Sequence, residues 1–302
     1  GTRVEIDRID LDLSSRVRVE GFYVEDYEQD TMIYVKRATA SISSLNIVQD
    51  GLRISTAEVE GAKLYLQELA NGEINIRPIV RNLQNPNGQS NFRLFIDDIE
   101  ARDAEFRFER LVHRNPEYGI DYYDMQVTDI KATVRDFSVV KGCVECEVAS
   151  LSGRERSGFV IDNISSGLYV NRGVIRFDEF RAQTATSSLY APSVVLDGED
   201  WNEYKYYIDE VDMIGNVTAT TISTEDLGYF APGLKDWNTT VRDIEATFVG
   251  VVRDFEGVLS SASIGDGSRV RGKYHITGLP DWRTSNYAFG IEDLYATSDD
   301  IT

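Results

Sequence analysis

The fold is decided by an alternating stretch near the start of the chain, residues 3–19, which reads RVEIDRIDLDLSSRVRV. Successive side chains of a β-strand point to opposite faces, so this stretch predicts strands with one apolar and one charged face. The same pattern returns at residues 92–96 (FRLFI) and 105–108 (EFRF), and it continues through most of the 302 residues. The sequence therefore predicts a mainly β protein whose strands share an apolar face.

That apolar face needs a cover, and the sequence offers hardly any long amphipathic helix to provide one. Two short helices are expected, one at 77–83 and one near 223–231 that begins with the capping sequence STED at 223–226. The cover must then be a second sheet, the same sheet curled on itself, or an apolar ligand. We predict an elongated, repetitive, mostly antiparallel meander, curled into an open, taco-like trough with an apolar concave face.

Turn residues suggest how the chain is divided. The clearest loop, at 85–91, separates segment 1–84 from segment 92–200, and a third segment, 201–302, contains the short helix. We expect the three segments to form one continuous groove and to be a fragment of a longer polypeptide. Residues 1–76 are expected to hold six or seven strands, because Gly61 suggests a bend between two short strands.

Charge limits the classes of partner. The net charge of −20 argues against a nucleic-acid-binding protein, since the phosphate backbone requires a basic surface. It also argues against docking flat on an anionic membrane. We interpret the acidic residues as the solvated outer faces of strands, which keep a long β protein soluble and discourage pairing between sheet edges.

Catalytic and metal-binding patterns are missing from the sequence. Cys143 and Cys146 form a C-x-x-C, but they fall on opposite faces of an alternating run, and no second such motif completes a zinc site. His113 and His275 stand in unrelated contexts. We therefore predict that the protein is not an enzyme and has no cofactor.

Six stretches carry a resemblance to a known family: GTRVEIDRIDLDL at 1–13, VRVEGFYVED at 17–26, ISTAEVEGAKLYL at 54–66, LSGRERSGF at 151–159, FAPGL at 230–234 and VRGKYHITGLP at 270–280. They resemble segments of the AsmA/TamB family, in particular TamB proteins of the Bacteroidetes type. The first two resemble the segment that follows the membrane anchor, and the third resembles a strand pair of AsmA-like domains, which would make 1–84 an AsmA-like unit.

The resemblance implies a periplasmic protein, anchored to the inner membrane by an N-terminal helix that these residues do not include. It implies bridge-type lipid transfer, in which phospholipids move along a hydrophobic groove from the inner to the outer membrane, with a role in outer-membrane biogenesis. It also implies that a C-terminal region outside this chain meets an outer-membrane barrel of the Omp85 class.

The predicted lipid-binding residues are apolar side chains in register with one another. Burying an acyl chain contributes about 0.8 kcal/mol per CH₂, so a continuous apolar stripe could hold lipid without recognising its headgroup. The stripe is predicted to consist of Val4, Ile6, Ile9, Leu11, Leu13, Val17, Val19, Ile42, Ile54, Leu64, Leu66, Leu94, Ile96, Phe106, Phe108, Val127, Val134, Ile175 and Phe177.

Two alternatives stay open at this point. In the first, the protein is a structural or adhesive β protein whose apolar face is closed by a second sheet. In the second, it is a chaperone-like scaffold whose strand edges pair with the unfolded strands of outer-membrane proteins.

Overall fold

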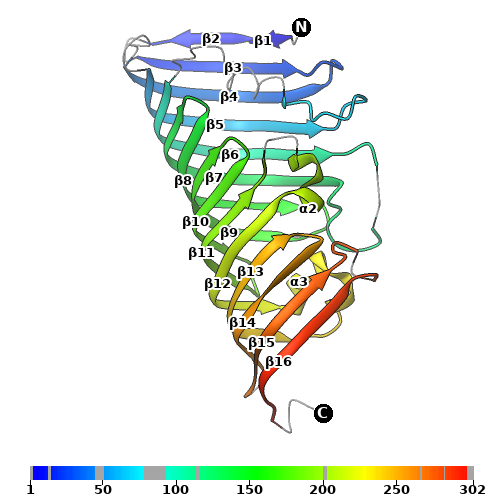
Figure 1. Cartoon of the computed structure of the whole chain (residues 1–302). Coiled ribbons are helices and arrows are strands. Elements are labelled where there is room, and N and C mark those ends of the chain that lie inside the picture. Colours follow the sequence, from blue (N-terminus) through cyan, green and yellow to red (C-terminus); the bar gives the residue numbers. More distant parts are fainter. Residues whose placement is uncertain are drawn as a thin grey trace. The chain divides into compact units, whose positions relative to one another are not determined.

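The computed structural model describes residues 3–12, 15–44, 51–77, 93–112, 116–199, 203–265, 267–281 and 283–297 (Figure 1). The chain is mainly β, and its strands belong to one sheet of 16 strands that is not closed, because β16 pairs on one side only. The strands are β1 (Val4–Glu5), β2 (Arg8–Leu11), β3 (Arg16–Glu25), β4 (Thr31–Ser44), β5 (Leu52–Gln67), β6 (Arg93–Glu109), β7 (Asp124–Val140), β8 (Cys143–Glu155), β9 (Val160–Asn171), β10 (Val174–Gln183), β11 (Ser188–Asp197), β12 (Asp212–Ser223), β13 (Thr240–Val251), β14 (Asp254–Ile264), β15 (Ser268–Thr277) and β16 (Asn286–Tyr295).

The strands follow one another in the sheet almost in chain order, which confirms the predicted meander. Both β1 and β2 pair with β3. Among the pairings that are described, β5 with β6 is parallel and the others are antiparallel. A parallel pair needs a crossover of a dozen or more residues, and residues 68–92 between the two strands are long enough to supply it.

The chain forms two compact units. Unit 1 consists of Gly1–Pro116, Asp121–Val160 and Leu168–Asn171, and unit 2 consists of Glu117–Ile120, Ile161–Gly167 and Arg172–Thr302. The division into segments 1–84, 92–200 and 201–302 stays a prediction. The predicted loop at 85–91, Leu13, and all but the first residue of the predicted helix at 77–83 lie outside the described residues.

The described part of residues 1–76 contains five strands, fewer than the six or seven predicted. The bend at Gly61 does not end a strand: β5 continues through this residue with φ of 64°, and β3 continues through Gly21 with φ of 63°. Asp103 in β6 and Asp129 in β7 also have positive φ. At such a kink the strict alternation of side chains is interrupted. The apolar residues of one strand therefore lie at odd positions before the kink and at even positions after it, or the reverse.

The helices are short. Unit 2 contains η1 (Glu203–Tyr206), α2 (Tyr207–Glu210), α3 (Thr224–Phe230) and η2 (Pro232–Leu234). The predicted helix near 223–231 is confirmed, and the Ser223 hydroxyl caps it by accepting a hydrogen bond from the Glu225 N–H at 3.2 Å. The Asp226 carboxylate does not complete a capping box. It accepts hydrogen bonds from the hydroxyls of Thr184, Thr186 and Ser187 instead.

Candidate functional site

The apolar face of unit 1 is built from rows of side chains that run across the strands. Residues paired in register point to the same face of a sheet, so each row is continuous from strand to strand. One row consists of Val4, Val24, Ile33, Leu64, Phe106 and Val127. A second consists of Leu11, Val17, Ala40, Ala57, Ile99, Val134 and Val148. A third consists of Ile42, Ile54, Ile96 and Phe137.

The remaining predicted residues of unit 1 that lie in strands form further apolar pairs across the strands. Ile9 pairs with Val19, and Leu66 pairs with Phe108. Leu94 pairs with Val139, which the prediction missed although it follows the same alternation. Ile6 lies between β1 and β2, outside either strand.

Unit 2 has a corresponding apolar face, to which Ile175 and Phe177 belong. The prediction named only these two residues, although the alternation after residue 189 pointed to more. The row through Ile175 continues with Leu196, Met213, Gly250, Phe255, Ile276 and Tyr287. The row through Phe177 continues with Val194, Gly215, Phe248, Gly257, Tyr274 and Phe289.

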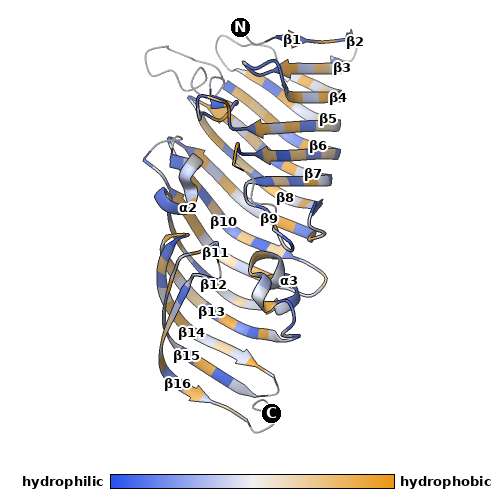
Figure 2. Cartoon of the chain, turned by 90° about the vertical axis from the view of Figure 1, so that its right-hand side faces the viewer, coloured by the Kyte–Doolittle hydropathy of each residue, from blue (hydrophilic) through white to orange (hydrophobic). Residues whose placement is uncertain are grey.

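Neither apolar face carries a second layer of protein in the described residues. Of the predicted residues that are described, Val4, Ile6, Ile9 and Leu11 are exposed, and all the others are half-buried. Only one of the fully buried apolar side chains, Val24, belongs to a row described above; the others are Met32, Leu69, Ala191, Ile208, Val211 and Ala262. Figure 2 shows the alternation of apolar and polar residues along the strands, with the helices confined to short segments. The apolar faces are therefore open to solvent or to a ligand.

The opposite face of unit 1 is charged, and its charges alternate across the strands. One row consists of Arg8, Glu20, Arg37, Glu60 and Arg102. Lys36 Nζ lies 2.7 Å from Glu60 Oε1, and Arg37 Nη1 lies 3.0 Å from Glu60 Oε2. These contacts hold the pKa of Glu60 below its usual value, mainly through the hydrogen bond from Lys36. Cross-strand pairs of opposite charge favour this register over one slipped by a residue.

In unit 2, aromatic rings lie over glycines on the apolar face. A Cβ on Gly215 would approach Phe248 Cζ to 2.5 Å, and a Cβ on Gly257 would approach the Tyr274 hydroxyl oxygen to 2.6 Å. That hydroxyl donates a hydrogen bond to the Thr247 carbonyl oxygen at 2.8 Å. Phe255 meets Tyr274 edge-on, with ring centroids 6.2 Å apart. The tyrosine hydroxyl is thus satisfied, and the ring presents an apolar surface.

The two cysteines lie on opposite faces of β8, as predicted. Val144 and Val148 pair with Val139 and Val134 of the apolar face, which places Cys146 between them on that face. Both cysteines are free, and burial raises the pKa of each thiol. A raised pKa lowers the fraction of reactive thiolate, which is the opposite of what a redox centre needs.

Within the described part of the chain, no group of three or more His, Cys, Asp or Glu side chains could hold a metal ion. None of the helices described there is long and apolar enough to cross a membrane. Comparison with protein-family models and with curated proteins finds no match. The resemblance to the AsmA/TamB family therefore rests on the sequence stretches given above.

Proposed function

We propose that this protein is a bridge-type lipid carrier, whose open apolar faces hold the acyl chains of phospholipids. The observation that supports this most is the set of apolar rows, continuous across the strands of each unit and without a protein layer over them in the described residues. Moving a long acyl chain from a bilayer into water costs roughly 12 kcal/mol at about 0.8 kcal/mol per CH₂, and contact with a continuous apolar face offsets much of that cost. Neighbouring strands repeat the same lining, so a lipid can slide without a deep energy minimum.

The cellular setting is part of the same proposal. Together with the family resemblance, an apolar conduit fits movement of phospholipids through the periplasm from the inner to the outer membrane. An inner-membrane anchor and an Omp85-class partner would belong to parts of a longer polypeptide. The chemistry needed is non-covalent, so the proposal requires neither a catalytic residue nor a cofactor.

The chaperone-like alternative has its own supporting observation. Among the described strands, β16 pairs only with β15, and all ten of its residues are exposed, including Tyr287, Phe289 and Ile291. An exposed apolar edge is a template for adding a strand of another chain. If this alternative is correct, the chaperone-like activity depends on the β16 edge and tolerates charged substitutions on the apolar face.

A vesicle assay separates the two functions. Purified chain is mixed with donor vesicles that contain a quenched fluorescent phospholipid and with unlabelled acceptor vesicles. We expect the chain to accelerate transfer, and Leu94→Glu or Phe106→Glu to remove most of the acceleration. Thr56→Glu places the same charge on an exposed residue of the opposite face and serves as the matched control. Unchanged transfer by the Leu94 and Phe106 variants would reject the lipid-carrier function.

A further inference from the structure

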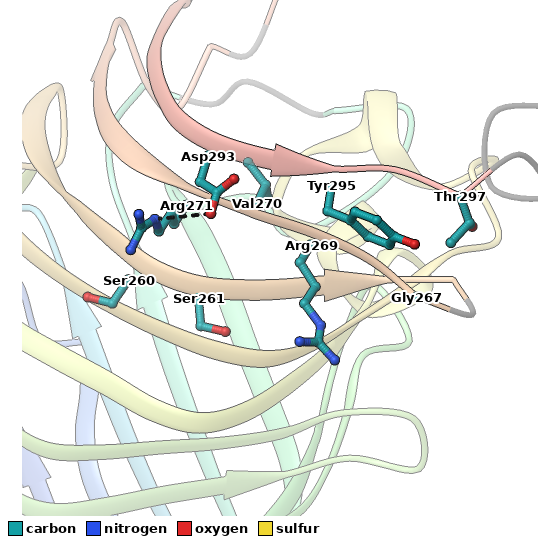
Figure 3. A pocket seen from close by; sticks show the side chains of 9 residues that line it. All are labelled: Ser260, Ser261, Gly267, Arg269, Val270, Arg271, Asp293, Tyr295 and Thr297. Carbon is teal, nitrogen blue, oxygen red and sulfur yellow. Dashed lines mark ion pairs between the residues drawn. The ribbon is translucent and has the colours of Figure 1, made fainter.

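Unit 2 contains a pocket at the end of the sheet, where β14, β15 and β16 lie side by side. It has a volume of about 620 Å³, within the range of small-molecule sites, and is open on one side. Its lining comes from β14, β15, β16 and the adjoining turns (Figure 3): Ser260, Ser261, Gly267, Arg269, Val270, Arg271, Asp293, Tyr295 and Thr297. Arg269 and Arg271 flank Val270, which pairs with Ala262 and Leu294, so both arginines point to the face opposite that of Val270.

The pocket is unusually cationic for this chain. The whole protein has 51 acidic and 31 basic residues, whereas the pocket combines two arginines with one carboxylate, that of Asp293. Asp293 pairs in register with Arg271, and their closest side-chain atoms are 3.6 Å apart. This separation is longer than a charge-assisted hydrogen bond, so the pair leaves guanidinium donors of Arg271 for another acceptor.

Arg269 differs from other arginines of unit 2. Arg176 and Arg181 lie 2.9 Å and 3.3 Å from the carboxylates of Asp178 and Glu179, and Arg253 pairs with Asp209. Arg269 has no such partner among the residues that the structure describes, since its register neighbours are Ser263 and Tyr295. Figure 3 shows Ser260 and Ser261 of β14 beside the two arginines of β15.

We propose that this pocket binds a phosphoryl group. A guanidinium donates two parallel hydrogen bonds to phosphate oxygens, and serine and tyrosine hydroxyls can donate to the remaining oxygens. Arg269 supplies the main contact, and Arg271 adds a second as it turns from Asp293. The phosphoryl group can come from a soluble phosphorylated molecule or from a phospholipid headgroup at a membrane surface. This inference does not rest on the lipid-carrier function, because both arginines alternate along β15 with Val270, Tyr274 and Ile276 and so point away from the apolar face.

Calorimetric titration of the purified chain with glycerol 3-phosphate tests the site. We expect one binding event per chain, weakened roughly tenfold or more by Arg269→Gln because a charge-assisted contact is lost. Arg242→Gln removes an exposed arginine of β13 outside the pocket lining, and we expect a change of less than about twofold at physiological ionic strength. Asp293→Asn should tighten binding roughly threefold, since it removes the competing carboxylate. Absence of binding, or equal effects of the two arginine variants, would overturn the site.

Sedimentation with vesicles identifies the source of the phosphoryl group. If the ligand is a headgroup, the wild-type chain binds vesicles that contain phosphatidylglycerol, and Arg269→Gln reduces this binding while Arg242→Gln does not. If titration shows the expected Arg269-dependent binding of glycerol 3-phosphate without vesicle binding, the ligand is a soluble phosphorylated molecule. Either result supports the pocket. Titration and sedimentation both measure binding of a phosphoryl group and not of acyl chains. Both results can therefore be interpreted even if the lipid-carrier function is rejected.

Discussion

Tyr274 lies across Gly257 on the apolar face of unit 2, and its hydroxyl reaches the Thr247 carbonyl oxygen on the strand beyond. The Tyr274 ring fits in this position because Gly257 has no side chain. This arrangement makes the face smooth and apolar where a tyrosine would otherwise present a hydroxyl.

Gly257→Ala is expected to destabilise the protein by about 1–3 kcal/mol, because the added methyl would overlap the Thr247 carbonyl oxygen and Tyr274. Urea unfolding followed by circular dichroism measures the loss. Gly290→Ala is the control, since its Cβ would have its nearest neighbour, the Lys273 carbonyl oxygen, at 3.9 Å. Equal stability of the two variants would show that the ring does not depend on the glycine.

Asp26 is expected to be the most sensitive carboxylate of unit 1. It is 3% exposed, and its oxygens accept hydrogen bonds from the Glu28 and Asp30 N–H groups and from the side chains of Gln67 and Asn75. Asp26→Ala leaves these donors without their acceptor, and we expect a loss of about 2–4 kcal/mol in urea unfolding. Asp97→Ala, at an exposed position, should stay within about 0.5 kcal/mol of wild type. A small loss for Asp26→Ala would mean that water replaces the carboxylate.

Much of the fold could be predicted from the sequence because one physical signal, the period-two alternation, extends through it. Strands such as β3, β6 and β10 follow directly from that signal. The number of strands was overestimated because glycine in a strand can mark a kink as well as a turn. Only the continued pairing of β5 on both sides of Gly61 distinguishes the two cases.

Contacts between distant segments could not be predicted. Residues 117–120 dock on α3, where Tyr118 stacks on Tyr229 with ring centroids 5.4 Å apart and Lys235 lies over the Tyr118 ring. The Ile120 N–H donates to the Tyr229 carbonyl oxygen at 2.8 Å. More than 100 residues separate these two segments, and no pattern within a short stretch of sequence predicts a contact between them. The pocket around Arg269 was missed for the same reason, since three strands supply its lining.

Cys143 and Cys146 are expected to remain reduced and to react slowly with alkylating reagents. The two cysteines are three positions apart in an extended strand, which places their Cα atoms about 10 Å from each other, beyond the reach of a disulfide. Burial raises the pKa of both thiols, so less thiolate is present near neutral pH. Iodoacetamide labelling followed by mass spectrometry should be slower than for a free model thiol and should accelerate as pH rises. Rapid labelling at neutral pH would contradict this.

Acidification is expected to weaken the charged row on unit 1. The pKa of Glu60 is lowered from 4.5 in the folded chain by Lys36 and Arg37. A carboxyl of this kind stabilises the fold above its unfolded pKa, and that contribution is lost as pH falls through the lower, folded value. Glu60→Gln should therefore reduce stability slightly at pH 7 and have little effect below the folded pKa. An effect of Glu60→Gln that is the same at both pH values would contradict this prediction.

The most direct test of the lipid-carrier function is native mass spectrometry of the chain after incubation with phospholipid vesicles. Two neighbouring residues of β11 give a matched pair, because Val194 lies on the apolar face and Ser193 pairs with Asp178 on the opposite one. We expect several phospholipids bound per wild-type chain, with binding lost in Val194→Glu and Ile54→Glu and retained in Ser193→Glu and Thr56→Glu. A folded wild-type chain without lipid, or equal lipid in all four variants, would contradict the lipid-carrier function.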